Sequence, residues 1–516
     1  MFSSIDIHLS KILQISIEYL KNNWSDLLVV SLFLPVYLIN KFYKFKQLAT
    51  LTGDSITHIL FHNFKKQGLE INVCGVVGGR GLNLPAILYR LSSLIFPSYR
   101  YSIKVNLVTY SNLIFLTCLE IYIFYSVFLD RGLLGAFLAL LCVGLIPSIS
   151  ILSWSEKGSY SKFSERFLAL ISNGVFVYYS LKIAFGSTEP STIIITSISL
   201  ISSIYLGKFS RQAVFFWTIF LLFFSFNISL LIPLLACGFV IIIDGDLRNE
   251  IFAQWIYLKN YKSYQAQNFE VSESTVKKIF PRYGLSEFKL LRVYMRLFLH
   301  SGVGILIMLP TAYFLFVEKY SEFQIIFYGT LFIAVLTTTH LLYFIGSGDR
   351  YMYHLVTIPA FILINNFGSS VPMIWVNGII VIFYLVLNIR SIHTHYKLVK
   401  DKCVAYLNFF KNIGINKTVF FDHYKDGEIF QLVNGIYTDQ FKTSTSRSYL
   451  WDEQSKVIFS SYPKISFEKE ILSGFSVDFI ISISAFCRSD LELIGESMGY
   501  KLYRVLQTTP CEASIK

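Results

Sequence analysis

The chain has 516 residues, of which 54% are hydrophobic, 17% aromatic and only 15% charged. Charged residues make up roughly a quarter of an average soluble domain, so this composition excludes an ordinary soluble protein. Several apolar runs reach the ~20 residues that cross a hydrocarbon core, which predicts a multi-pass membrane protein. The net charge of +12 is typical of lysines and arginines beside anionic lipid, and we expect no nucleic-acid partner.

The chain order suggests three regions. Residues 1–23 have apolar positions near helical spacing and are predicted to lie on the membrane. Residues 24–390 are predicted to form an all-α membrane bundle of about eleven transmembrane helices. The expected spans lie near 24–40, 106–128, 133–153, 165–184, 191–206, 211–226, 228–244, 292–317, 323–345, 352–367 and 371–389.

Two long polar stretches interrupt this bundle. The first loop, 41–104, contains two segments that are apolar on one side, 55–67 and 84–96, which predict short helices at the membrane interface. The second large loop covers 245–288. In the apolar run before it, Ser225–Asn227 and Pro233 indicate two short helices joined by a tight turn.

The character of the chain changes after Arg390. Residues 391–412 resemble an amphipathic linker helix. Short strand-like runs follow at Thr418–Phe421, Val457–Phe459 and Phe479–Ser482, and they alternate with Leu491–Met498. Asp426-Gly427 and Asn434-Gly435 read as turn residues between them. Residues 391–516 are therefore predicted to hold the linker helix and a small soluble α/β domain.

The number of crossings and the distribution of basic residues predict opposite orientations in the membrane. An odd number of crossings from a cytoplasmic N-terminus places the first loop, the second loop and the C-terminal domain outside. The many basic residues of the first loop favour the inside, although long loops cross membranes largely regardless of charge.

Asp54 in the first loop is the main catalytic candidate. It directly follows the first predicted span and stands in a segment that is otherwise apolar or hydroxylic. A carboxylate at the bilayer edge can take a proton from an acceptor hydroxyl or help to hold a divalent cation. The same position, before the apolar pattern Ile56, Ile59 and Leu60, also suits a helix cap, and the two roles are compatible.

Further carboxylates follow in the next predicted loop. Glu156 and Glu165 could join Asp54 in binding a metal or in acid–base chemistry. Each has a cation nearby in the sequence, Lys157 or Arg166, and a solvated loop explains them as well. The sequence thus specifies no cofactor and leaves a divalent metal as an alternative.

The glycine-rich turn 346–348 leads into Asp349, Arg350 and Tyr351 at the start of a predicted helix. An arginine there can grip a phosphate through two parallel hydrogen bonds, and the tyrosine can add another. An aromatic and basic anchor at the membrane interface is the alternative.

The first loop offers weaker candidates as well. Arg80, in Gly78-Gly-Arg-Gly81, could meet an anionic headgroup, although this segment matches no nucleotide-binding motif. His58 and His62 are four residues apart, as metal ligands on one helical face can be, but no third ligand is evident.

Three stretches resemble the GT-C glycosyltransferases, and among these the aminoarabinose transferases and protein O-mannosyltransferases. They are Gly53-Asp54 with its following helix, GLNLPAILYR at 81–90, and DRYMYHLVTIP at 349–359. The soluble C-terminal segment is also similar to the α/β domain of many members.

The resemblance implies a polyprenyl-phosphate-linked sugar donor, a lipid or glycan acceptor, and transfer on the extracytoplasmic side of a cell membrane such as the bacterial inner membrane. By the resemblance Asp54 would be the catalytic carboxylate, and Arg350 with Tyr351 would border the donor phosphate. The residues themselves add Glu156 as a second catalytic candidate and Arg80 as a further phosphate contact, with His58, Glu165 and Asp349 in support. The alternatives are a polysaccharide polymerase or a lipid-linked glycan carrier or transporter that needs no carboxylate.

Overall fold

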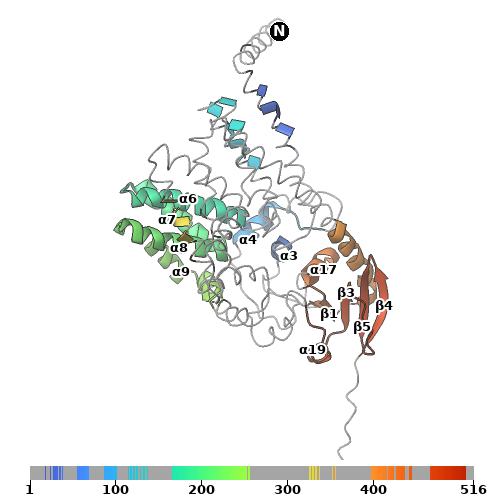
Figure 1. The fold of residues 1–516 in the computed structure, drawn as a ribbon. Helices are drawn as coiled ribbons and strands as arrows, with labels where there is room; N and C mark the ends of the chain where they lie inside the picture. Colours follow the sequence, from blue (N-terminus) through green and yellow to red (C-terminus); the bar gives the residue numbers. More distant parts are fainter. Residues whose placement is uncertain are drawn as a thin grey trace, which may run out of the picture.

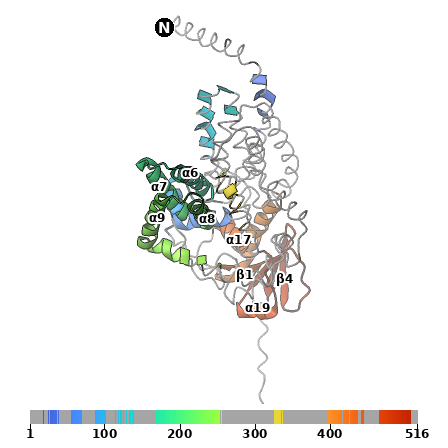
Figure 2. The same cartoon turned by 60° about the vertical axis from the view of Figure 1, so that its left-hand side comes forward.

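The computed structural model describes the chain at residues 55–68, 87–100, 166–252, 397–414, 416–423, 426–435, 441–443 and 465–506. It also describes single helical positions between 18 and 38, 114 and 137, 254 and 258, 325 and 336, and at 351 and 355. These residues form a group of apolar helices and a mixed five-stranded sheet. In Figures 1 and 2 the sheet lies on the opposite side of the molecule from α9.

Four helices follow one another in the middle of the chain, and they coincide with predicted spans. They are α6 (Arg166–Ala184), α7 (Pro190–Tyr205), α8 (Lys208–Ser225) and α9 (Leu231–Ile243), with the short 3-10 helix η2 (Ile228–Leu230) before α9. Their buried apolar side chains, with Ile325, Ile326, Ile333, Tyr351 and Leu355, form a cluster that we call the bundle core.

The predicted turn between α8 and α9 is confirmed. Phe226 ends α8 in the left-handed conformation with a φ of 51°. The next residue, Asn227, accepts a hydrogen bond from the Ser229 amide at 2.9 Å and donates one to the Ile183 carbonyl at 2.6 Å. The turn is thereby fastened to the end of α6. Pro233 does not break the helix as expected, because it lies in the first turn of α9, where a missing amide hydrogen costs little.

Small hydroxyl residues line the buried face of α7. They are Thr192, Thr196, Ser199 and Ser203. Three of these hydroxyls, those of Thr196, Ser199 and Ser203, donate to a carbonyl four residues earlier in the same helix and so have a partner inside the buried face. Ser172 of α6 also donates to the Ser199 carbonyl at 2.8 Å. Small residues of this kind let two helices approach closely.

The outward faces of the same helices carry large apolar side chains. Examples are Ile198, Phe223, Leu235, Phe239 and Ile242, with 59% to 74% of their surface accessible. Burial of hydroxyls and exposure of bulky apolar groups is the reverse of the usual arrangement in water.

Length and apolar composition together decide whether a helix can cross a bilayer. Within the described ranges no single helix is both long and apolar enough to cross it. The helical segments Ile228–Ile243 and Gly245–Phe252 are long and apolar enough only when taken together, and the chain bends by 97° between them. The other predicted spans are described only at scattered helical positions or lie outside the described residues.

The C-terminal sheet has the strand order β2-β1-β3-β5-β4. Its strands are β1 (Lys417–Phe421), β2 (Phe441–Thr443), β3 (Phe479–Ser482), β4 (Leu491–Ser497) and β5 (Tyr500–Val505). β1 is parallel to β2 and β3, whereas β5 is antiparallel to β3 and β4. Helix α17 (Asp426–Asn434) follows β1, and α19 (Lys469–Gly474) precedes β3.

The predicted strands at 418–421 and 479–482 are confirmed, and 457–459 lies outside the described residues. The turn at Asp426-Gly427 is wrong, because both residues belong to the first turn of α17. Gly435 does end that helix, with a φ of 68°. The segment predicted at 491–498 to alternate with these strands is itself a strand, β4 (Leu491–Ser497), which a tight turn at Met498-Gly499 joins to β5.

The first loop contributes both of its predicted helices, α3 (Ser55–Lys66) and α4 (Ile87–Ile95). Their buried apolar residues share one cluster with the linker helix, which is helical at 397–413, and with β1, α17, β3 and β5. We call this cluster the loop–domain core. In Figure 1, α3 and α4 lie between α8 and α17.

Candidate functional site

Helix α3 begins at Ser55, the residue that follows Asp54 in the chain. The sequence predicts one buried face for it, through Ile56, Ile59 and Leu60. In the structure every residue from 56 to 64 is buried, the polar ones included. α3 is therefore enclosed on all sides, whereas α4 leaves apolar side chains such as Leu94 exposed.

The polar side chains of α3 are matched to partners on and after α4. His58 Nδ1 lies 2.6 Å from the Tyr89 hydroxyl. His62 Nε2 donates to the Pro97 carbonyl at 3.0 Å, and its Nδ1 lies 2.8 Å from the Ser92 hydroxyl. Asn63 pairs with the backbone of Tyr99 in both directions, at 3.0 and 2.7 Å.

These contacts give the two histidines a structural role in joining the helices. Both ring nitrogens of His62 are occupied by hydrogen bonds, so it cannot serve as a metal ligand in this state. Burial lowers its pKa below 6.5, which keeps the ring neutral near pH 7. No cluster of three or more potential metal ligands occurs among the described residues.

Thr57 connects α3 to the C-terminal domain. Its hydroxyl donates a hydrogen bond to the carboxylate of Glu428 in α17, and both side chains are buried. Sequence reasoning missed Glu428, because nothing near it in the chain indicates a partner so far away. The only local sign was a glutamate followed by the apolar residues Ile429 and Phe430.

Tyr351, predicted to border the donor phosphate, lies in the bundle core and is fully buried. Its hydroxyl donates to Gln212 Oε1 of α8 at 2.9 Å. Its ring packs edge-on against Phe209 and Phe216, one turn before and one turn after Gln212. Tyr351 therefore joins a distant part of the chain to the start of α8.

The beginning of α8 carries a polar layer of three consecutive residues, Ser210, Arg211 and Gln212. Ser210 donates to Asn173 of α6 at 2.7 Å, and Arg211 forms a buried ion pair with Glu250. Gln212 accepts from Tyr351, as described above. Three separate parts of the chain therefore meet at one end of α8.

The Arg211–Glu250 pair was also missed by sequence reasoning. The sequence signal for this pair was a charged residue beside each of two apolar runs. Unpaired charges are costly in an apolar bundle, so such residues are expected to find one another. Within the described part of the chain, Arg211 Nε and Nη1 have no hydrogen-bond partner, and the residue is only 8% exposed.

Of the predicted catalytic, donor-binding and supporting residues, His58 and Tyr351 fall within the described part of the chain. His58 contacts Tyr89 beside the loop–domain core, whereas Tyr351 belongs to the bundle core. The other candidates lie outside the described residues. They are Asp54, Arg80, Glu156, Glu165, Asp349 and Arg350.

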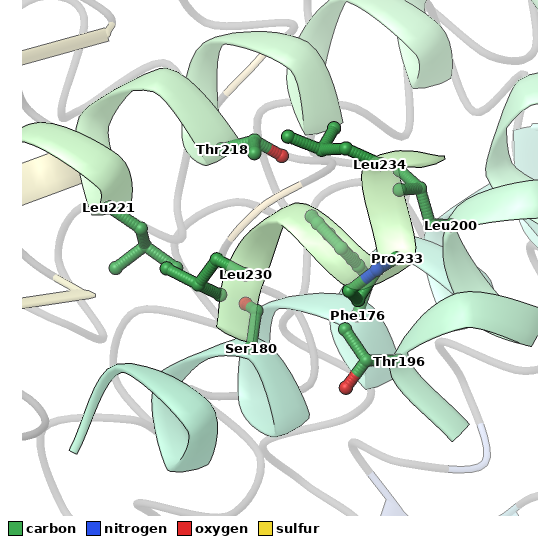
Figure 3. Close-up of a pocket in the computed structure, with 9 residues that line it drawn as sticks. All are labelled: Phe176, Ser180, Thr196, Leu200, Thr218, Leu221, Leu230, Pro233 and Leu234. Carbon is green, nitrogen blue, oxygen red and sulfur yellow. The ribbon is translucent and has the colours of Figure 1, made fainter. Parts of the chain in front are cut away.

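A narrow pocket lies between α6, α7, α8, η2 and α9 (Figure 3). Leucines, Phe176 and Pro233 make up most of its wall, and three hydroxyls complete it. Thr196 and Thr218 donate to carbonyls of their own helices, and Ser180 accepts from Trp217 Nε1 at 3.0 Å. With no room for a water molecule, it is a gap in packing rather than a ligand site.

The sequence matches no protein-family model and is not detectably similar to any curated protein.

Proposed function

We propose that the protein is a membrane glycosyltransferase that moves a sugar from a polyprenyl-phosphate donor to an extracytoplasmic acceptor, with Asp54 as the general base. The enclosure of α3 supports this role. A helix that is buried from residue 56 to residue 64 can hold the residue before it in a fixed position, and Asp54 directly precedes its first residue. Catalytic groups need such a rigid support to hold a reactive geometry.

A membrane location is supported by the surfaces of α6 to α9. Their hydroxyl groups face inward, and large apolar side chains such as Phe223 and Leu235 face outward. Water would penalise this arrangement, whereas lipid tails would not. The exposed Leu91, Leu94 and Ile95 of α4 suit the edge of the same lipid layer.

In the proposed reaction Asp54 takes the proton of an acceptor hydroxyl while that oxygen attacks the anomeric carbon of the sugar. The bond between this carbon and the phosphate oxygen breaks, and polyprenyl phosphate leaves with the bonding electrons. Phosphate is a good leaving group, so no strong general acid is needed. Arg350 and Arg80 would border the phosphate, and Glu156 would assist Asp54, whereas the hydroxyl of Tyr351 is already committed to Gln212.

The decisive experiment compares Asp54→Asn with the wild-type protein in proteoliposomes supplied with a panel of polyprenyl-phosphate monosaccharides. Loss of a general base lowers transfer by about a hundredfold or more. We expect that loss without a change in the amount of inserted, folded protein. Glu156→Gln tests the second carboxylate in the same assay.

Full transfer by Asp54→Asn would remove this residue from the mechanism. If Arg350→Ala and Arg80→Ala then abolished activity, a polymerase or carrier that grips an anionic glycan would be the better explanation.

A further inference from the structure

The first turn of α3 is tied to the C-terminal domain by a buried hydrogen bond between residues 371 positions apart in the chain, Thr57 and Glu428. Thr57 is 1% exposed and Glu428 is 4% exposed, so water does not compete for either group. A hydrogen bond to a buried carboxylate is among the stronger polar contacts, and it fixes direction as well as distance.

Glu428 is itself held firmly. Asp426, in the same turn of α17, forms an ion pair with Lys402 of the linker helix at 2.8 Å. Tyr406 of that helix packs against Phe430 and Phe421, and all three rings are buried in the loop–domain core. The carboxylate that receives the Thr57 hydroxyl is therefore part of a rigid surface.

We propose that the C-terminal domain positions the catalytic loop, with Thr57 and Glu428 as positioning residues for Asp54. This inference rests on the proposed function of Asp54. Thr57 follows Asp54 within one helical turn, so a shift of the first turn of α3 would carry the carboxylate away from its acceptor. A displacement of about 1 Å can cost a hundredfold in rate.

Cross-linking tests the contact independently of activity. Thr57→Cys and Glu428→Cys are introduced together into the full-length protein, which is treated in membranes with a thiol cross-linker a few ångströms long. Digestion and mass spectrometry should find the two positions joined. The two single variants control for the native cysteines, of which Cys403 belongs to the same core. Absence of the cross-link in folded protein would overturn the inference.

Kinetics test the positioning role. Thr57→Val keeps the shape of the side chain but loses the hydroxyl, whereas Thr57→Ser keeps the hydroxyl. We expect Thr57→Val to lower kcat tenfold to about a hundredfold with little change in the KM for the donor, and Thr57→Ser to restore it. Glu428→Leu should behave like Thr57→Val. Glu492→Gln is the matched control, because this carboxylate is half exposed on the edge strand β4.

An unchanged kcat in Thr57→Val, or a loss that only follows the amount of folded protein, would overturn the positioning role. Failure of the proposed function gives a different result, because Asp54→Asn would then stay active whether or not positions 57 and 428 are cross-linked.

Discussion

At the scale of single residues, His62 shows how the first loop is held together. Its ring donates to the Pro97 carbonyl and contacts Ser92, and it is fully buried. Burial lowers its pKa from the ordinary value of 6.5, and the nearby charge of Lys66 acts in the same direction. The hydrogen bond to Pro97 opposes this effect but does not outweigh it.

This pKa makes the stability of the loop depend on pH. As the pH falls through 6.5, His62 takes up a proton in the unfolded chain before it does so in the folded one. The unfolded state therefore binds more protons, and the free energy of unfolding decreases below that pH. We expect His62→Gln to reduce this decrease, by up to about 1.4 kcal/mol per pH unit. Denaturant unfolding of both proteins from pH 7.5 to pH 5 measures the difference.

Glutamine is a suitable replacement because its amide can still donate to Pro97 and accept from Ser92 without titrating. Parallel pH profiles for the two proteins would show that His62 has the same pKa in the folded and unfolded states.

At the scale of helices, close contact at Gly329 is the clearest packing constraint. A Cβ at this position would lie 2.5 Å from the Phe220 ring and 2.7 Å from the Trp217 ring. Trp217 is fully buried and hydrogen-bonded to Ser180, so it has little freedom to move. The helical segment around 329 can therefore approach α8 only because residue 329 has no side chain.

We predict that Gly329→Ala destabilises the bundle by about 1–3 kcal/mol, the usual cost of overpacking. Gly238→Ala is the matched control, because Gly238 is also helical and nothing lies within 4 Å of an added Cβ. The control should be neutral or slightly stabilising, since alanine favours helix more than glycine does. Thermal unfolding in detergent distinguishes the two, and equal midpoints would contradict the close approach.

At the scale of the whole molecule, the packing of the chain does not follow its order. α3 and α4 precede the bundle helices in sequence, yet their apolar residues belong to the loop–domain core with β1, α17 and β3. α6 to α9 form the bundle core separately. Residues that share a core tend to unfold together.

We therefore expect the amides of α3 to exchange hydrogen together with those of β1 and β3. Native-state hydrogen exchange over a denaturant series should give these segments one common opening free energy. The amides of α6 to α9 should follow a separate curve. Exchange of α3 in step with α8 instead would show that the first loop is stabilised by the bundle.

Local sequence patterns were sufficient to predict many of the helices and strands. The apolar runs predicted α6 to α9, and the polar break at Ser225–Asn227 predicted the turn between two of them. One-sided apolar spacing predicted α3 and α4, and β-branched and aromatic runs predicted β1 and β3. These features are set by neighbours within a few residues, which is why periodicity detects them.

Contacts between distant residues were decided only by the tertiary structure. A one-sided helix at the interface was expected for residues 55–67, but α3 is enclosed, because Thr57, His58 and His62 find partners in other elements. Asp426-Gly427 read as a turn and became the start of α17, since Asp426 pairs with Lys402 there. Composition determined that the chain is rich in apolar helices. Which polar groups meet inside it depended on three-dimensional packing, because a buried hydrogen bond needs a partner that no local pattern specifies.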